Sequence, residues 1–175
     1  TVEVIGNALA SIVEEMGETL VRASYSTNIK ERRDSSTCLF DAKGRTLCQA
    51  SHIPIHLGSL IGVVDEIAKR FDMADVREGD VFIGNDAYTG GGTHLSDVSL
   101  VMPIFYQNQL VAFSANKAHW TEVGGKDPGS WTTDSTDVFQ EGLQFPCVRL
   151  FSKGEPNEAL FDVIGANVRT PDMSL

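Results

Sequence analysis

A histidine and an aspartate stand three residues apart directly after a run of glycines, as His94 and Asp97 in GGGTHLSD. This spacing brings both side chains to one side of a turn, where one cation could take an imidazole nitrogen and a carboxylate oxygen together. Glycines at Gly90–Gly92 permit positive φ angles and a close approach of the backbone. The pattern therefore indicates a metal site, although a histidine beside glycine, taken alone, is more often a hydrogen-bonded loop residue.

Another histidine, His119, ends a stretch that predicts the second strand of a hairpin. The first strand of that hairpin begins just after Asp97. Antiparallel pairing brings the end of one strand beside the start of the other. We therefore expect His94, Asp97 and His119 to meet. Two histidines and one carboxylate with open positions form an ordinary catalytic site for a divalent metal such as zinc or manganese.

Three further carboxylates could belong to the same site. Asp34, in KERRDSS, could be a fourth ligand or the surface partner of a neighbouring arginine. Asp86, in GNDAY, could be a ligand or a catalytic residue, or could simply form a turn. Glu122 could orient His119, act as a general base near the metal, or remain a solvated carboxylate. These alternatives stay open on the residues alone.

The other histidines, His52 and His56, flank Pro54 and could line the same pocket. Packing beneath the following helix is the role expected of at least one of them. Trp120 and Trp131 border the glycine-rich segments. We expect these tryptophans to pack in the core or the loops, with an aromatic wall for a ring substrate as the alternative.

Several other catalytic patterns are missing from the sequence. The glycines of GGGTH are not followed by Lys-Ser or Lys-Thr, so the chain has no P-loop for ATP. It also has no GxSxG nucleophile motif. Three cysteines that never form a CxxC pair predict reduced thiols in a cytoplasmic protein; they are Cys38, Cys48 and Cys147.

These residues need a scaffold, and the hydrophobic periodicity predicts one made of helices and hairpins. The pattern predicts helices over 3–23, 60–71 (N-capped by Ser59) and 157–167, hairpins over 37–50 and 98–120, strands at 81–85 and 147–154, and an ordered loop over 124–137. Because no βαβ unit repeats, the expected fold class is α+β, with antiparallel hairpins packed with helices.

Length and charge restrict the class of protein. A chain of 175 residues with 42% apolar residues suits one globular domain over residues 1–175. The net charge of −10 disfavours nucleic acid and anionic membranes as partners. No apolar run reaches the ~20 residues of a membrane span, and the first residues lack a secretory signal. We therefore expect a cytoplasmic protein, and the ending VRTPDMSL predicts a fragment of a longer chain.

A set of ordered motifs resembles the hydantoinase B/oxoprolinase B family, which includes N-methylhydantoinase B, 5-oxoprolinase and the metal-bearing subunits of acetone and acetophenone carboxylases. The motifs span the chain and read TVEVIGNALASIVEEMG, YSTNIKERRDSS, LFDAKGR, HIPIHLGS, GDVFIGNDAY, GGTHLSDVSLVMPIF, AHWTEVGG, PGS, EGLQFPCVRL and NVRTP. Family members are much longer. The resemblance thus implies the N-terminal part of a larger family fold.

The resemblance also implies a ligand set and a partner. It implies a metal held by His94, Asp97 and His119, with Asp34 joining them or lying close by. It implies a hetero-oligomer in which ATP is bound by a hydantoinase A-type partner, which phosphorylates the substrate.

From the site and the resemblance together, we expect the metal-bearing subunit of an ATP-dependent hydrolase of hydantoin, oxoproline or lactam rings. Amide N–H groups of the Gly90–Gly92 loop would stabilise a developing oxyanion. One alternative is a subunit of an ATP-dependent ketone carboxylase that uses the same site. The other is a non-catalytic assembly subunit whose structural metal is closed by four protein ligands.

Overall fold

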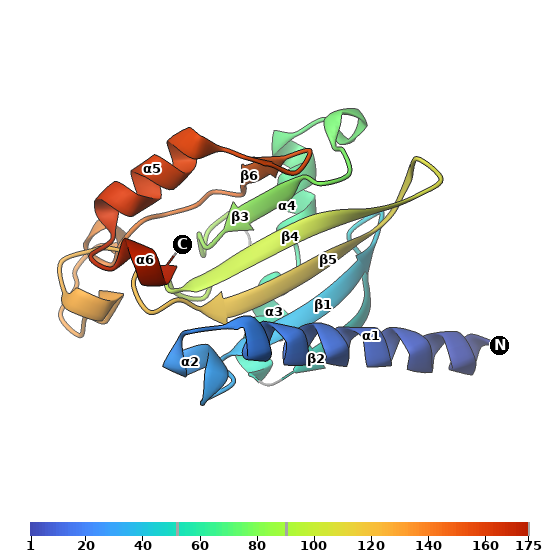
Figure 1. Cartoon of the computed structure of the whole chain (residues 1–175), viewed down its shortest axis with the longest axis horizontal. Coiled ribbons are helices and arrows are strands. Elements are labelled where there is room, and N and C mark those ends of the chain that lie inside the picture. The colour runs from blue at the N-terminus through green and yellow to red at the C-terminus, as the bar shows by residue number, and fades with distance from the viewer. Residues whose placement is uncertain (52, 90, 175) are drawn as a thin grey trace.

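The computed structural model describes residues 1–51, 53–89 and 91–174. Figure 1 shows a long curved sheet with helices on both faces. Along the chain the elements are α1 (Val2–Ala23), α2 (Thr27–Lys30), β1 (Ser35–Asp41), β2 (Thr46–Ser51), α3 (Pro54–Leu60), α4 (Val63–Arg70), η1 (Met73–Asp75), β3 (Val81–Gly84), β4 (Asp97–Tyr106), β5 (Gln109–His119), η2 (Pro128–Ser130), η3 (Val138–Gln140), β6 (Val148–Ser152), β7 (Glu155–Pro156), α5 (Glu158–Asn167) and α6 (Pro171–Ser174).

Within the described residues the strands form one antiparallel sheet in the order β2-β1-β5-β4-β3-β6-β7. The α+β class and both predicted hairpins, β1–β2 and β4–β5, are confirmed. The hairpins join through β1 and β5, where Ser36 lies opposite Lys117. At the end of the second hairpin Asp97 lies opposite His119. Polar residues of three neighbouring strands therefore gather at one end of the sheet.

One face of the sheet carries the main hydrophobic core. Phe40, Phe82 and Phe113 point to this face and are buried against α4, which contributes Val63 and Ile67. Because side chains alternate along a strand, the neighbouring residues point to the opposite face. The helices α3 and α4 are thus fixed on the face that also carries the polar end of the sheet.

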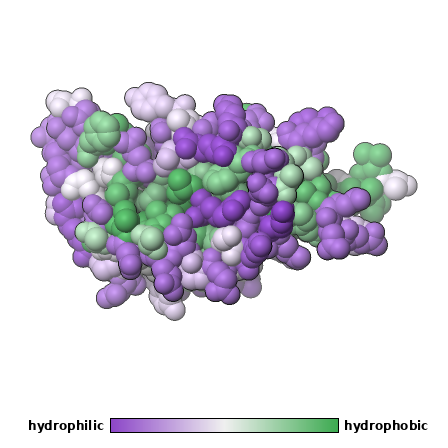
Figure 2. Space-filling model, turned by 90° about the horizontal axis from the view of Figure 1, so that it is seen from above, coloured by the Kyte–Doolittle hydropathy of each residue, from purple (hydrophilic) through white to green (hydrophobic). Residues whose placement is uncertain are grey.

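Helices α1 and α5 cover parts of the opposite face. Val13 of α1 packs on Leu39, and Ile164 of α5 packs in a cluster with Ile83. The 22-residue α1 is the amphipathic helix predicted from the sequence, and no described helix is long and apolar enough to cross a membrane. Its first residues project beyond the body, as the hydrophobic surface at the right-hand end of Figure 2 shows, and expose Val2, Val4 and Ile5.

The predicted helix over 60–71 is in fact two helices, and Ser59 is not its N-cap. α3 ends at Leu60, and Gly62, with a φ of 87°, turns the chain before α4 begins. Ser59 lies inside α3, where its hydroxyl donates a hydrogen bond to the carbonyl of His56. The apolar spacing continues across the break, so the sequence pattern did not reveal the first helix.

Candidate metal centre

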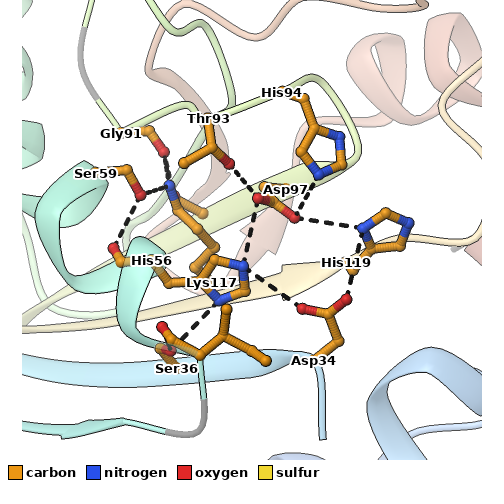
Figure 3. Close-up of polar contacts among 12 residues, drawn as sticks. Asp34, Ser36, His56, Ser59, Gly91, Thr93, His94, Asp97, Lys117 and His119 are labelled. Atoms are coloured by element: carbon orange, nitrogen blue, oxygen red, sulfur yellow. Dashed lines mark hydrogen bonds and ion pairs between the residues drawn. The ribbon is translucent and has the colours of Figure 1, made fainter. Parts of the chain in front are cut away.

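The ends of β4 and β5 bring Asp97 and His119 together. The two residues face each other in the strand ladder, and Asp97 Oδ1 lies 3.4 Å from His119 Nδ1. Both side chains are buried. Figure 3 shows the Asp97 carboxylate directed towards the rings of His94 and His119. The hairpin alone accounts for this first pair of site residues.

His94 approaches the same carboxylate from the glycine-rich loop. The backbone N–H of Asp97 donates to the carbonyl of His94 at 3.0 Å, which closes the turn expected from the three-residue spacing. His94 Nε2 lies 3.2 Å from Asp97 Oδ1, and the His94 and His119 ring centroids are 5.1 Å apart. The structure therefore brings together the three residues predicted to meet.

Close backbone packing fixes the loop that carries His94. Gly91 has a φ of 86°, and a Cβ added at Gly92 would lie 2.1 Å from the carbonyl oxygen of Asn85. The buried Asn85 amide donates to the carbonyl of Leu95 at 2.7 Å. Both glycines are thus required by the geometry, as predicted; Gly90 lies outside the described residues.

Asp34 joins the cluster from the segment before β1. Its carbonyl accepts a hydrogen bond from the His119 N–H at 3.0 Å, and its Oδ2 lies 3.9 Å from His119 Nδ1. Its Oδ1 lies 3.5 Å from His56 Nε2. The alternative role of Asp34 was to pair with a neighbouring arginine. Arg33 instead forms an ion pair with Glu18 of α1.

His56 occupies a more central position than the sequence indicated. Its Nε2 lies 3.3 Å from Asp97 Oδ2 and 3.5 Å from Asp34 Oδ1, so it stands between the two carboxylates. Its Nδ1 lies 3.3 Å from the hydroxyl of Ser36. The side chain is only 2% exposed. His56 is thus a buried residue of α3 itself that borders the site, whereas His52 lies outside the described residues.

The neighbouring imidazoles stabilise the charged form of Asp97. Burial alone would raise the pKa of this carboxyl, but the close imidazoles of His119, His56 and His94 hold the pKa well below its ordinary value. In turn, the Asp97 carboxylate close to its ring raises the pKa of His94. The charged form of Asp97 is thus favoured inside the fold.

The donor atoms fit a divalent cation. Two sets of three have their ligand atoms within 4.8 Å of one another: His94, Asp97 and His119, and Asp34, His56 and Asp97. The buried Asp97 Oδ1 also lacks a well-aligned hydrogen-bond donor, despite the two ring nitrogens close to it. Imidazole nitrogens and carboxylate oxygens are ligands that zinc and manganese accept.

The cluster opens into a cavity of about 660 Å³. This volume lies in the range of small-molecule sites. Trp131 lines the cavity with its ring edge-on to His94, at 6.4 Å between centroids and 84° between planes. Trp120 instead packs against Phe145 in the core. Trp120 therefore packs in the core as expected, whereas Trp131 borders the cavity.

The sequence profile of the hydantoinase B/oxoprolinase family matches residues 1–175. The chain belongs to this family. It is 42% identical over 179 residues to an uncharacterized protein of Methanocaldococcus jannaschii, covering 100% of this chain and 31% of that protein. It is 35% identical to a putative D-/L-hydantoinase subunit of Pseudomonas sp. (99% and 30% covered) and 38% identical to 5-oxoprolinase 1 of Arabidopsis thaliana (86% and 12%).

Two solved structures share the fold. The ATP-dependent caprolactamase of Pseudomonas jessenii superposes with a TM-score of 0.72 at 34% identity, over 91% of this chain and 29% of that chain. A nucleotide-free acetone carboxylase superposes with a TM-score of 0.88 at 22% identity, over 97% and 22%. The second likeness concerns the fold alone. This hydantoinase B-family chain spans less than a third of the length of each of these relatives and structures.

Lys117 is a buried cation behind the cluster that the sequence analysis did not single out. Its ammonium donates hydrogen bonds to the Gly91 carbonyl and the Ser59 hydroxyl. Burial lowers its pKa to about 8, partly offset by the charge of Asp97. Lys117 thus ties the glycine-rich loop to α3. The sequence could have pointed to Lys117 through its position two residues before His119 on one strand, because this spacing puts both side chains on the same face.

Glu122 is buried as an anchor of the loop after β5. Its carboxylate accepts hydrogen bonds from the N–H groups of Gly124 and Gly129, at 2.8 and 2.9 Å. It also forms an ion pair with Arg169 at 3.0 Å. Its side chain is 3% exposed, so the alternative of a solvated carboxylate is wrong.

Asp86 forms the turn that was considered as its alternative role. Its carboxylate accepts hydrogen bonds from the Tyr88 N–H at 2.8 Å and the Thr89 hydroxyl at 3.0 Å. Asp86 is not one of the described residues that line the cavity. The structure therefore does not bring Asp86 into the group formed by the predicted ligands.

Proposed function

We propose that this chain is part of the metal-bearing subunit of an ATP-dependent enzyme that opens cyclic amides such as hydantoins, oxoproline or lactams. The observation that carries the proposal is the convergence of two carboxylates and three imidazoles on one cavity. Relatives named as a hydantoinase subunit, a 5-oxoprolinase and a caprolactamase support the substrate class. Because the chain covers a minor part of them, the activity is proposed for the whole protein.

Each site residue has a distinct role in this proposal. Asp34, His94, Asp97 and His119 would hold a divalent metal, zinc or manganese. When bound, such a metal supplies Lewis-acid chemistry at a carbonyl or phosphoryl oxygen. His56 would act behind the ligands, because its Nε2 faces both carboxylates and would fix their orientation.

The cavity wall suits a flat ring. Trp131 and Ile55 line it with apolar surface, although both are largely exposed in the chain alone. Thr93, which lines the cavity, donates a hydrogen bond to Asp97. Among the described residues of the lining, neither Gly91 nor Gly92 is present. The oxyanion role expected for the loop amides therefore does not enter the proposal.

ATP would be bound by a hydantoinase A-type partner, since these 175 residues contain no P-loop. That partner would phosphorylate the ring oxygen, and the protein containing this chain would complete the reaction in a hetero-oligomer. Two relatives are named as single subunits of larger enzymes, one of a hydantoinase and one of a caprolactamase, which supports an assembly of different subunits.

Two other functions remain as outcomes of the test. A ketone carboxylase subunit would use the same ligands, but the likeness to acetone carboxylase at 22% identity carries the fold and not the substrate. A structural metal would be closed off by its protein ligands, with no position open to water or substrate. The cluster instead borders a cavity of about 660 Å³, which favours a catalytic role.

The test is an assay of the whole protein reconstituted with its ATP-binding partner. Hydantoin, 5-oxoproline and caprolactam are each supplied with ATP, with and without bicarbonate. We expect ring opening without bicarbonate, coupled to ATP hydrolysis and lost in His94→Ala together with the metal. ATP-dependent consumption of acetone only in the presence of bicarbonate would contradict the proposal in favour of the carboxylase. Full ring-opening activity in a metal-free complex would contradict the role of the cluster.

A further inference from the structure

Arg32 places a positive charge on the wall of the cavity. Among the described residues that line the cavity, it is the one lysine or arginine. It is exposed, and within the described part of the chain it forms no ion pair. A cation kept unpaired beside a candidate active site suggests a ligand that is not part of the protein.

The neighbouring Arg33 points elsewhere. Its guanidinium is paired with Glu18 of α1, and its φ is 53°, a left-handed conformation that is uncommon for arginine. This backbone conformation separates Arg33 from Arg32 and Asp34, which both line the cavity. Conformations of this kind cost free energy and tend to occur at functional sites. The segment is thus shaped so that one of its two arginines borders the cavity.

The balance of charge indicates what Arg32 would bind. A divalent metal would neutralise the carboxylates of Asp34 and Asp97, and Arg32 would then give the cavity a surplus of positive charge. A guanidinium is planar, always charged, and able to donate to two oxygens of one phosphate. Two residues of chain span at most roughly 7 Å, so an anion bound beside Asp34 lies within reach of the long Arg32 side chain.

We propose that Arg32 binds the anionic oxygens of a phosphorylated substrate and places its phosphoryl group beside the metal. This inference rests on the proposed function, which supplies the phosphorylated substrate. Asn28 and Thr121 line the same cavity and offer further polar groups to the same anion. Arg32 is then a substrate-binding residue and has no part in holding the metal.

The test compares Arg32→Gln with Arg33→Gln in the intact, metal-loaded protein. The two variants lose the same charge at adjacent positions, but Arg32 lines the cavity whereas Arg33 is paired with Glu18. Inorganic phosphate is titrated by calorimetry at constant ionic strength, with acetate as a second probe, and the metal content of each sample is measured. We expect Arg32→Gln to weaken phosphate binding by roughly tenfold or more, Arg33→Gln to change it by less than about twofold, and both to keep their metal.

Several results would overturn the inference. One is phosphate binding by Arg32→Gln as tight as that of the wild type. A second is an equal loss in both variants, which would reflect overall charge. A third is a loss confined to acetate, which would assign Arg32 to a carboxylate. Absence of metal from the wild-type protein would instead count against the proposed function, while the phosphate titrations would still judge Arg32 separately.

Discussion

Both carboxylate oxygens of Asp97 face polar side chains of the site. Its Oδ1 faces His94 and His119, while its Oδ2 faces His56 and accepts a hydrogen bond from the Thr93 hydroxyl. A carboxylate that is hydrogen-bonded in its charged form stays ionised even when it is buried. The charge that would attract a cation is therefore built into the fold before any cation binds.

Glu122, unlike Asp97, has contacts that indicate a structural role. In Glu122→Gln the side chain keeps its size but loses its charge, so the ion pair with Arg169 is broken and an amide faces backbone N–H donors. We expect the free energy of unfolding, measured by urea denaturation, to fall by about 1–3 kcal/mol.

The matched control is Glu155→Gln, at an exposed position on β7. Its effect should stay within about 0.5 kcal/mol. If Glu122→Gln unfolds like the wild type while the complex loses its activity, the general-base role considered from the sequence is correct and the structural role is not.

At the scale of elements, the glycine-rich loop positions His94 and Asp97. Gly92→Ala would force a Cβ into the carbonyl of Asn85 and the N–H of Ala87, at 2.1 and 2.4 Å. Because both obstacles are backbone, the loop must move. We expect a loss of stability of about 2 kcal/mol or more, together with weaker metal binding, measured by urea denaturation and metal titration.

Gly58→Ala is the control for this change. Gly58 lies in α3, and an added Cβ meets nothing within 4 Å. Alanine there should stabilise the helix by up to about 1 kcal/mol, because it restricts the unfolded chain. Equal effects of the two alanines would show that the loop tolerates a side chain and that its close packing is not required.

The sequence predicted those parts of the site that depend on local geometry. Asp97 and His119 are joined by one hairpin, and His94 belongs to the same turn as Asp97, so spacing alone brought the three together. The strands and the long helix followed from alternation and from helical periodicity in the same way. Asp34 could be placed only through the family resemblance, since β1 and β5 come together over a long stretch of chain.

The residues that the sequence did not place depend on contacts between distant segments. His56 reaches Asp97 only because α3 packs on the sheet, and the α3–α4 break was hidden by apolar residues that continue the helical spacing. Lys117 looked like an ordinary strand residue, because its partners Gly91 and Ser59 come from two other segments. Such side chains become visible only once the elements are packed.

At the scale of the whole molecule, the antiparallel sheet brings the residues of the site together. The candidate ligands come from the segment before β1, the loop before β4, and the facing ends of β4 and β5, while α3 adds His56 from one face. The segment before β1, α3 and the β4–β5 hairpin lie apart in sequence but meet at one end of the sheet. A bound cation would link them, and its binding energy would then add to the stability of the fold.

The most direct test of the metal site is the metal content of the purified protein, measured by elemental analysis for the wild type, Asp97→Asn and Asp86→Asn. The two variants make the same chemical change, one in the cluster and one in the turn outside the cavity. We predict that the wild type and Asp86→Asn retain a divalent metal and that Asp97→Asn loses it, with folding of all three checked by circular dichroism. Full metal content in a folded Asp97→Asn would contradict the proposed site.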